Sequence, residues 1–494
     1  MDKIRNKPVL RNLVLGFGLL VMAAGALAVF TSGSDGEKRL QPRLQQAPMN
    51  PEFIRYMYER KAGEPWVGYT KEGHALGLIP SPLDPAIFKP EAGLEEPVQI
   101  ESLPALYDLR TRNKLTPVKD QRACGACWAF ATFGSLESFL KPGAVWDFSE
   151  QDLIEKAGFD SEECEGGGTN MSVAYLARWA GPWPETSHPY EYTFLTGIPV
   201  MKHVQNVIMM PAKKNALDNA KIKDAVYKYG AVLAEMCFLY SAYKWLTYSY
   251  YYNGSTDSNG HTVCIVGWDD NYAKSNFNST PAGNGAFIVK NSFGTGWGEA
   301  GYFYVSYYDR FFGKRGGTAM FKGESVNNYR ANYGYDDLGW LANVGAGNSS
   351  TFWMANIFKA GATGYVKAVS FYTSANSNPY EIYIYTNVSS GKPTTGTKYA
   401  KAKKGTILGR GYYTIPLGFY VPITKGKYFS VVVKLRTTGY NYPIPIESKI
   451  PGYSSAAKSA KGQSYIAQDG ISWTELKSND PAWCNVCLRA FTKY

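Results

Sequence analysis

The chain has 494 residues, of which 45% are hydrophobic and 19% are charged, and its formal net charge is +11. The length excludes a single domain of ordinary size, and the apolar content is sufficient for two hydrophobic cores. The 7 cysteines are an odd number, so disulfide pairing within the chain leaves at least one thiol free.

The first 30 residues have the features of an export signal. A basic start is followed by an uncharged run from Leu13 to Phe30, which contains an Ala-Leu-Ala sequence of the kind that signal peptidases cut. We expect a signal peptide over residues 1–30. The alternative is an uncleaved signal anchor, because the run is at the lower limit for a membrane span. Either outcome places the rest of the protein outside the cell, secreted or at the cell surface, where disulfides persist.

Residues 31–102 connect this signal to the remainder of the chain. They are rich in loop signals, as in the Pro-containing stretch 79–85, and they contain one short helical pattern, from Pro51 to Arg60. The segment is either a propeptide or a simple spacer.

Cys127 lies in the most informative string of the chain, Gln-Arg-Ala-Cys-Gly-Ala-Cys-Trp-Ala-Phe at 121–130. The string predicts a thiol at the start of a helix, just after a tight turn, where the helix dipole lowers the thiol pKa. A Cys-x-x-Cys pair is also found in zinc sites and redox sites. A zinc site needs a second pair of ligands, but the only other such pair, Cys484 and Cys487, lies in an apolar, strand-like tail. A redox pair would follow a buried strand, whereas a run of turn residues precedes Cys124. Catalysis is therefore favoured over metal or redox chemistry.

A thiolate nucleophile needs a base, a group that orients the base, and donors for the oxyanion. His261 begins an apolar strand pattern, so its imidazole can project from the end of a strand. Asn291 follows in the string Lys-Asn-Ser-Phe-Gly-Thr-Gly-Trp-Gly, and Gln121 comes six positions before the nucleophile. The remaining histidines are less suitable, since they lie upstream of this region, in a Pro-flanked loop or on a different strand: His74, His188 and His203.

These strings together resemble the motifs of the papain family of cysteine peptidases. The resemblance implies that Cys127 and His261 form a thiolate–imidazolium pair, that Asn291 orients the imidazole and that Gln121 stabilises the oxyanion. It implies a protein or peptide substrate, no metal ion and no organic cofactor. It also makes a propeptide the favoured interpretation of residues 31–102, since such peptidases are made as zymogens.

The same resemblance implies further site residues. Gly166 and Gly167 would line the cleft and bind an extended peptide through their backbone. Cys164 would pair with Cys124 in a disulfide that closes a loop of about 40 residues and contributes roughly 4 kcal/mol in the chain-entropy model.

The sequence departs from the family pattern beside the catalytic asparagine. Phe293 stands where the family usually has Trp, so Phe293 and Trp297 would provide the apolar cover of the site. Because Phe is smaller and lacks the indole N–H, we expect a working site with a wetter hydrogen bond between Asn291 and His261.

Residues 103–322 are expected to form the α+β, two-lobed protease domain. The helix-rich half comes first, with helices predicted at 128–140, 170–179 and 222–229. The sheet-rich half follows, with strands predicted at 231–236, 261–268, 287–289 and 302–305.

Residues 323–494 have an all-β pattern, with alternating or aromatic runs at 366–372, 380–385, 412–417, 428–435 and 464–468. This predicts a β-sandwich or jelly roll, and the arrangement resembles papain-like peptidases that carry a C-terminal lectin-like domain. Lys and Arg strongly exceed Asp and Glu here, which suggests binding to polysaccharide or an anionic surface. The alternative is a structural cap on the protease. No motif supports binding to nucleic acid, and contact with a membrane is expected only through an uncleaved anchor.

The sequence as a whole predicts an exported cysteine endopeptidase. Two alternatives remain: a catalytically weak, papain-like surface adhesin, and an acyl transferase that uses the same thiol.

Overall fold

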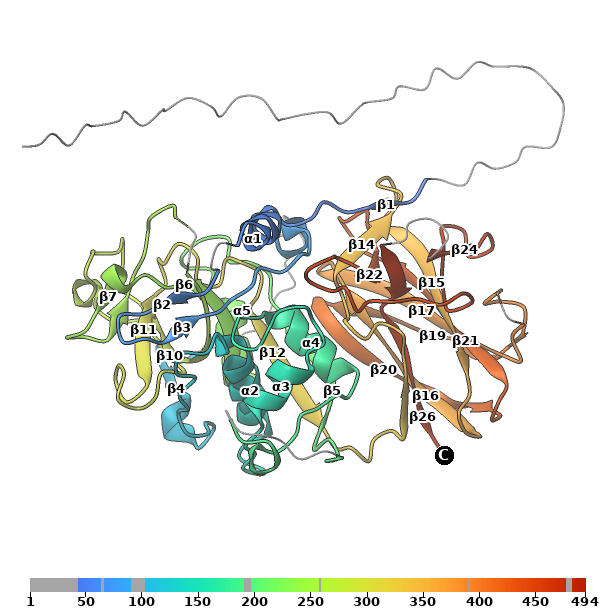
Figure 1. Ribbon diagram of the computed structural model, residues 1–494, viewed down its shortest axis with the longest axis horizontal. Helices are drawn as coiled ribbons and strands as arrows, with labels where there is room; N and C mark the ends of the chain where they lie inside the picture. Colours follow the sequence, from blue (N-terminus) through green and yellow to red (C-terminus); the bar gives the residue numbers. More distant parts are fainter. Residues whose placement is uncertain are drawn as a thin grey trace, which may run out of the picture. The chain divides into compact units, whose positions relative to one another are not determined.

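The computed structural model describes residues 43–63, 66–89, 103–190, 197–256, 259–389, 391–476 and 482–494. The signal or anchor expected over residues 1–30 lies outside these ranges. Residues 43–494 form one compact unit (Figure 1). No helix within the described ranges combines the length and the apolar character that crossing a membrane requires.

The α-helices within the described residues are α1 (Pro51–Lys61), α2 (Cys127–Leu140), α3 (Glu150–Lys156), α4 (Thr169–Ala177) and α5 (Ala220–Tyr229). Helix α1 forms where the sequence predicted it, because Asn50 caps the N–H of Glu52, Pro51 occupies the first turn, and basic residues end the helix. Helix α3, which the sequence analysis missed, begins at Ser149, whose hydroxyl caps the N–H of Asp152. Figure 1 shows α2, α3 and α4 grouped together, and the three helices contact one another.

The largest sheet contains 13 strands of the described residues. Its order along the main path is β13 (Ala331–Tyr333), β26 (Leu488–Lys493), β16 (Gly364–Thr373), β20 (Arg410–Ile423), β5 (His203–Met209), β12 (Ala319–Glu324), β6 (Val232–Cys237), β9 (Gly260–Asp269), β10 (Ala286–Lys290), β11 (Tyr302–Ser306), β8 (Ser249–Tyr250) and β7 (Tyr243–Lys244), and β4 (Leu106–Asp108) pairs with β9. Helix α2 packs against β6, β9 and β12 of this sheet.

A second sheet belongs to the C-terminal part of the chain. Within the described residues it holds β18 (Thr397–Lys398), β17 (Ser377–Thr386), β21 (Tyr428–Arg436), β15 (Thr351–Lys359), β23 (Ser464–Ala467) and β24 (Thr474–Glu475), with β19 (Lys403–Leu408) paired to β17. Its buried side chains, such as Phe352 and Val431, join those of β16 and β26 in one hydrophobic core. The C-terminal part is therefore an all-β sandwich, as predicted.

Two smaller sheets involve the segment that precedes the protease region. Strand β1 (Gln45–Gln46) pairs with β14 (Ala342–Gly345), which continues through β22 (Ile444–Ser448) to β25 (Trp483–Val486). Strands β2 (Gly68–Tyr69) and β3 (Ala75–Leu76) form a short hairpin. The upstream segment is thus paired with the C-terminal part of the molecule through β1, while β2 and β3 pair with each other.

The combination of a papain-like α+β region and a C-terminal β-sandwich agrees with the fold class expected from sequence. The expected boundary between residues 322 and 323 falls inside β12, which pairs with β5 and β6. Strand β20 of the C-terminal part also pairs with β5. The two regions therefore share one continuous sheet, a long-range pairing that local sequence patterns do not encode.

Candidate active site

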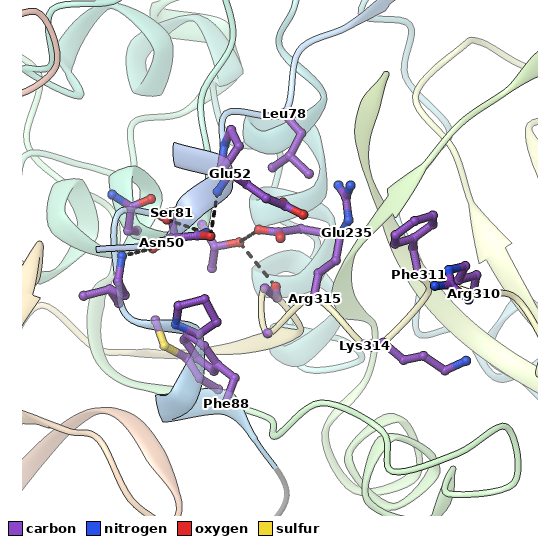
Figure 2. Close-up of a pocket in the computed structure, with 18 of the residues that line it drawn as sticks. Asn50, Glu52, Leu78, Ser81, Phe88, Glu235, Arg310, Phe311, Lys314 and Arg315 are labelled. Carbon is purple, nitrogen blue, oxygen red and sulfur yellow. Dashed lines mark hydrogen bonds between the residues drawn. The ribbon is translucent and has the colours of Figure 1, made fainter. Parts of the chain in front are cut away.

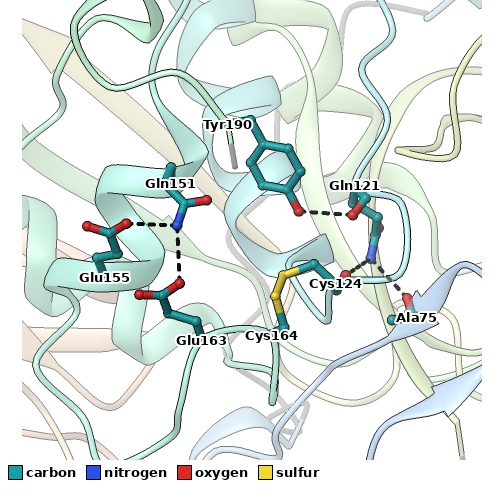
Figure 3. The surroundings of a disulfide bond; sticks show 8 residues. All are labelled: Ala75, Gln121, Cys124, Gln151, Glu155, Glu163, Cys164 and Tyr190. Atoms are coloured by element: carbon teal, nitrogen blue, oxygen red, sulfur yellow. Dashed lines mark hydrogen bonds between the residues drawn. A yellow bond between two sulfur atoms is a disulfide. The ribbon is translucent and has the colours of Figure 1, made fainter. Parts of the chain in front are cut away.

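Cys127 is the first residue of α2 and is fully buried. The preceding turn is held by a disulfide between Cys124 and Cys164, the pair that the family resemblance implied (Figure 3). The N–H of Gly125 also donates to the carbonyl of Cys164, at 3.0 Å. Because Cys124 is bonded to Cys164, it cannot form a metal or redox pair with Cys127, whose thiol is free.

His261 and Asn291 meet across adjacent strands of the large sheet. His261 is the second residue of β9, and Asn291 directly follows β10, the next strand. The Nε2 atom of His261 lies 2.8 Å from Oδ1 of Asn291, and both side chains are buried. The other ring nitrogen, Nδ1, has no hydrogen-bond partner among the described residues. Since β9 packs against α2, the imidazole is fixed on the strand that faces the helix of Cys127.

Gln121 is held in position from both ends of its amide. Its Nε2 donates to the carbonyls of Cys124 and Ala75, each at 2.9 Å (Figure 3). Its Oε1 accepts a hydrogen bond of 2.6 Å from the hydroxyl of Ser292, the residue after Asn291. A side chain fixed in this way presents its N–H groups in one direction, as an oxyanion donor must.

Phe293 covers the imidazole of His261, with ring centroids 4.8 Å apart in a stacked arrangement. The ring of His74 stacks on Phe293 at 4.4 Å, and Trp297 meets Phe293 edge-on at 5.4 Å. The side chains of Asn291 and His261 are both buried. His74 of the upstream segment adds to the cover over Phe293, so the wetter hydrogen bond expected from the Phe for Trp replacement stays a prediction for the chain without this segment.

Residues 75–79 of the upstream segment lie directly on the site. The N–H of Gly167 donates to the carbonyl of Gly77 at 2.9 Å, and the N–H of Ile79 donates to the carbonyl of Gly167 at 2.8 Å. The N–H of Leu78 donates to the carbonyl of Gly260, beside His261, at 3.0 Å. Gly167, expected to bind an extended peptide, thus binds one from the chain itself.

Glycine is required where Gly77 crosses the turn before Cys127. A Cβ atom on Gly77 would overlap the backbone of Gly125, and a Cβ atom on Gly166 would crowd the carbonyl of Gly77. The close approach lets the N–H of Gly77 act on the Cys127 thiol.

The covered site holds its two reactive groups in their neutral forms. Burial raises the pKa of the Cys127 thiol, although the N–H of Gly77 opposes this. Burial lowers the pKa of His261 to about 4. The hydrogen bond that His261 Nε2 donates to Oδ1 of Asn291 opposes this decrease, and nearby His74 adds to it. A thiolate–imidazolium pair is therefore disfavoured at neutral pH while residues 75–79 remain in place.

Sequence reasoning missed three contributors to this site. His74 was judged less suitable because it lies upstream of the protease region, and no motif marks the path of residues 75–79 within the expected propeptide. Glu235, on β6, lines a pocket next to Leu78. Its only sequence signal is a lone acidic residue within an apolar strand. His188 and His203 are engaged elsewhere, with Asp152 and Asn328 respectively.

Residues 103–315 match the family described as papain family cysteine protease, and residues 332–492 match the lectin-like domain. A cathepsin L-like peptidase of Aedes aegypti is 30% identical over 217 residues, which are 42% of this chain and 60% of that protein. Digestive cysteine proteinase 1 of Homarus americanus is 31% identical over 210 residues, which are 40% of this chain and 59% of that protein. The chain thus spans about 60% of the length of these curated relatives.

Solved structures resemble the chain over both regions. The cysteine protease and lectin-like domains of Cwp84, a surface layer associated protein of Clostridium difficile, superpose with a TM-score of 0.74 at 24% identity, covering 91% of this chain and 98% of that one. At that identity the likeness shows the fold. Clostridial Cwp84 after propeptide cleavage gives a TM-score of 0.67 at 26% identity, covering 78% of this chain and 99% of that one. Residues 103–315 therefore form a papain-like cysteine protease region, and residues 332–492 form a lectin-like domain.

Proposed function

We propose that this chain is the precursor of an exported cysteine endopeptidase that hydrolyses peptide bonds with Cys127 and His261. The observation that carries the proposal is the hydrogen bond between His261 and Asn291, made through Nε2, which leaves Nδ1 without a partner. The nucleophile begins the helix that packs against the strand of His261. This arrangement suits a base whose second nitrogen exchanges a proton with the thiol.

In the proposed reaction, the proton of Cys127 passes to Nδ1 of His261, and the thiolate sulfur attacks the carbonyl carbon of the substrate. The negative charge on the carbonyl oxygen is stabilised by Nε2 of Gln121 and by the backbone N–H of Cys127. When the tetrahedral intermediate collapses, the C–N bond breaks and His261 gives its proton to the leaving amine. A water molecule then attacks the thioester while His261 accepts its proton, which releases the acid product and restores the thiol.

The environment of Gln121 supports its part in this scheme. Its Nε2 already donates to a backbone carbonyl of the upstream segment, that of Ala75. A carbonyl oxygen is the ground-state form of the group whose charge develops in the reaction. Removal of one such donor from other acyl-transfer enzymes costs roughly 100-fold to 1,000-fold in kcat.

Residues 31–102 are proposed to be the propeptide that keeps the enzyme inactive. Residues 75–79 occupy the backbone positions of Gly167 and Gly260 that an extended substrate would need. The backbone N–H of Gly77 also acts on the thiol of Cys127. Removal of the segment would free these backbone positions and open the site.

For the lectin-like domain we propose binding to carbohydrate or to an anionic surface. Lys and Arg strongly exceed Asp and Glu over residues 323–494, which favours acidic partners. The similar Cwp84 is surface layer associated, which is consistent with a surface location for this chain. In the alternative adhesin, this domain would carry the function and the protease site would be weak.

The test uses the chain from residue 31 onward, before and after the segment up to residue 102 is removed by limited proteolysis. The processed protein is expected to react at Cys127 with an epoxide that alkylates papain-type thiols, and to cleave casein. Cys127→Ala should abolish both, whereas Cys237→Ala, which removes another buried cysteine outside the disulfide, should leave both unchanged. Processed wild-type protein that neither labels nor cleaves would favour the adhesin, and transfer to amines in excess of hydrolysis would favour the acyl transferase.

A further inference from the structure

A cavity of about 530 Å³ lies between the upstream segment and the protease region. On the upstream side it is lined by Leu78, Glu52 and Phe88, and on the protease side by Thr169, Glu235 and Arg315 (Figure 2). The cavity is mostly empty, so a side chain larger than those present fits into it.

Leu78 shows how a bound peptide reaches this cavity. The backbone N–H of Leu78 donates to the carbonyl of Gly260, and Leu78 forms a β-bridge with Gly167. Leu78 therefore has the position of a peptide residue that is held in the cleft next to Cys127. Its side chain lines the cavity and is buried. A peptide residue with a longer side chain in the place of Leu78 would extend toward the protease wall.

Glu235 lies on that wall. In the pairing of β6 with β9, Glu235 is opposite Thr262, and its neighbour Met236 is opposite His261, so the carboxyl is fixed relative to the catalytic base. Only 9% of Glu235 is exposed, and its Oε1 accepts a hydrogen bond of 3.1 Å from the hydroxyl of Thr169. Gly317 packs against the carboxyl group, and a Cβ atom there would overlap it. Gly317 thus leaves room for the carboxyl group of Glu235, which lines the cavity.

The charges around Glu235 decide what it binds. Burial raises the pKa of Glu235 to about 7, the guanidinium of Arg315 opposes this, and Glu52 of the upstream segment adds to it. Lys314 also lines the cavity, but its ammonium donates to the carbonyl of Asp309, and Figure 2 shows its side chain extending away from Glu235. Once Glu52 leaves with the upstream segment, Glu235 is the acidic group of the wall. A buried carboxyl of this kind gains most from a cation that enters the cavity.

We propose that Glu235 makes this cavity a specificity pocket for a basic side chain, lysine or arginine, at the substrate position that corresponds to Leu78. The inference rests on the proposed peptidase function and adds the substrate class of the same site. Arg315 limits the preference for a basic side chain, because its positive charge already interacts with the carboxyl group of Glu235.

The experiment uses processed enzyme and a set of peptides that differ only at this substrate position, carrying Lys, Arg, Leu or norleucine, at a pH of about 8 so that Glu235 is ionised. Norleucine is the control for length, since it resembles lysine without the charge. In the wild type we expect kcat/KM to be roughly ten-fold higher for Lys than for norleucine, a difference of about 1.4 kcal/mol. E235Q should remove this difference between Lys and norleucine, and its kcat/KM for norleucine should stay within about two-fold of the wild-type value. R315Q should increase the difference between Lys and norleucine.

The matched control is E324Q, which removes an exposed carboxylate at the end of β12, outside the cavity lining. A ratio of Lys to norleucine that is the same in wild type, E235Q and E324Q would overturn the inference. If norleucine peptides are cleaved while the ratio shows no charge preference, the inference alone fails. If no peptide is cleaved and Cys127 does not react with the epoxide, the proposed peptidase function fails instead.

Discussion

At the scale of single residues, the site is governed by the stack of His74, Phe293 and His261. Phe293 lies between the two imidazoles, and Nε2 of His74 also approaches Oδ1 of Asp120 at 3.4 Å. The sequence identified Phe293 as a weaker shield than the usual Trp. The structure shows that the upstream segment supplies a second ring over it. The burial of His261 and Asn291 is therefore a property of the form in which the segment covers the site, and we expect it to decrease when the segment is removed.

This arrangement predicts that acid opens the site. Burial places the pKa of His261 at about 4, below the ordinary value of about 6.5 for histidine, so protons bind more tightly to forms in which the imidazole is exposed. The stability of the covered form should therefore fall as the pH drops from about 6.5 to about 4. We expect the urea midpoint of the inactive Cys127→Ala chain to decrease over this range.

The control for this prediction is the double variant Cys127→Ala with His261→Gln, in which the titrating group is absent. All other titratable groups are the same in the two proteins. The decrease of the midpoint with falling pH should be smaller in the double variant. An identical pH dependence in the two proteins would contradict the assignment of the effect to His261.

At the scale of elements, the sequence predicted the helix and strands that carry the catalytic set, because their apolar patterns are local. The helix at Cys127, the strand at His261 and the strand before Asn291 all formed within a few residues of the expected bounds. The path of residues 75–79 could not be predicted, because it depends on backbone hydrogen bonds to Gly167 and Gly260, far along the chain. Backbone groups are the same at every residue, so such pairing leaves no pattern in the sequence.

The element that covers the site depends on one glycine, which gives a second prediction. In Gly77→Ala the new Cβ atom would overlap the backbone of Gly125, so residues 75–79 cannot seat as they do here. We expect the unprocessed variant to react with iodoacetamide at Cys127 at least about ten-fold faster than the unprocessed wild type, because the exposed thiol ionises more easily. Lys71→Ala, at an exposed position of the same segment, is the matched control and should react as slowly as the wild type. A slow reaction in both variants would show that the thiol is covered by some other means.

At the scale of the whole molecule, the upstream segment is held by both domains. Strand β1 pairs with β14 of the lectin-like domain, and Nε1 of Trp483 donates to Oε1 of Gln46 at 2.9 Å. In helix α1, Arg60 donates to the carbonyl of Gly452 at 2.8 Å. The lectin-like domain therefore helps to hold the upstream segment in place, a structural task in the proposed precursor. An added strand at a sheet edge is a frequent mode of peptide binding, because it satisfies the free backbone groups of that edge.

The contact between Phe53 and Tyr453 provides the sharpest test of this task. Phe53 is fully buried in α1, and its ring meets that of Tyr453, in the lectin-like domain, edge-on at 4.7 Å. Phe53→Ala would remove a buried aromatic side chain, a change that typically costs about 3–5 kcal/mol. We expect the precursor carrying Phe53→Ala to become active much sooner than the wild type, measured as the lag before a fluorogenic peptide is cleaved.

The comparison of lag with kcat/KM separates the binding of the upstream segment from catalysis, because Phe53 is absent from the processed enzyme. Processed protein from the variant and from the wild type has the same sequence, so kcat/KM should be equal and only the lag should differ. Ile54→Ala changes the next residue of the same helix, whose side chain is 54% exposed, and it should leave the lag unchanged. Equal lags for Phe53→Ala and Ile54→Ala, in precursors that both contain the disulfide between Cys124 and Cys164, would mean that the lectin-like domain contributes nothing to the inactive state. A shortened lag for Phe53→Ala alone would mean that the domain at the C-terminus helps to control when Cys127 becomes available.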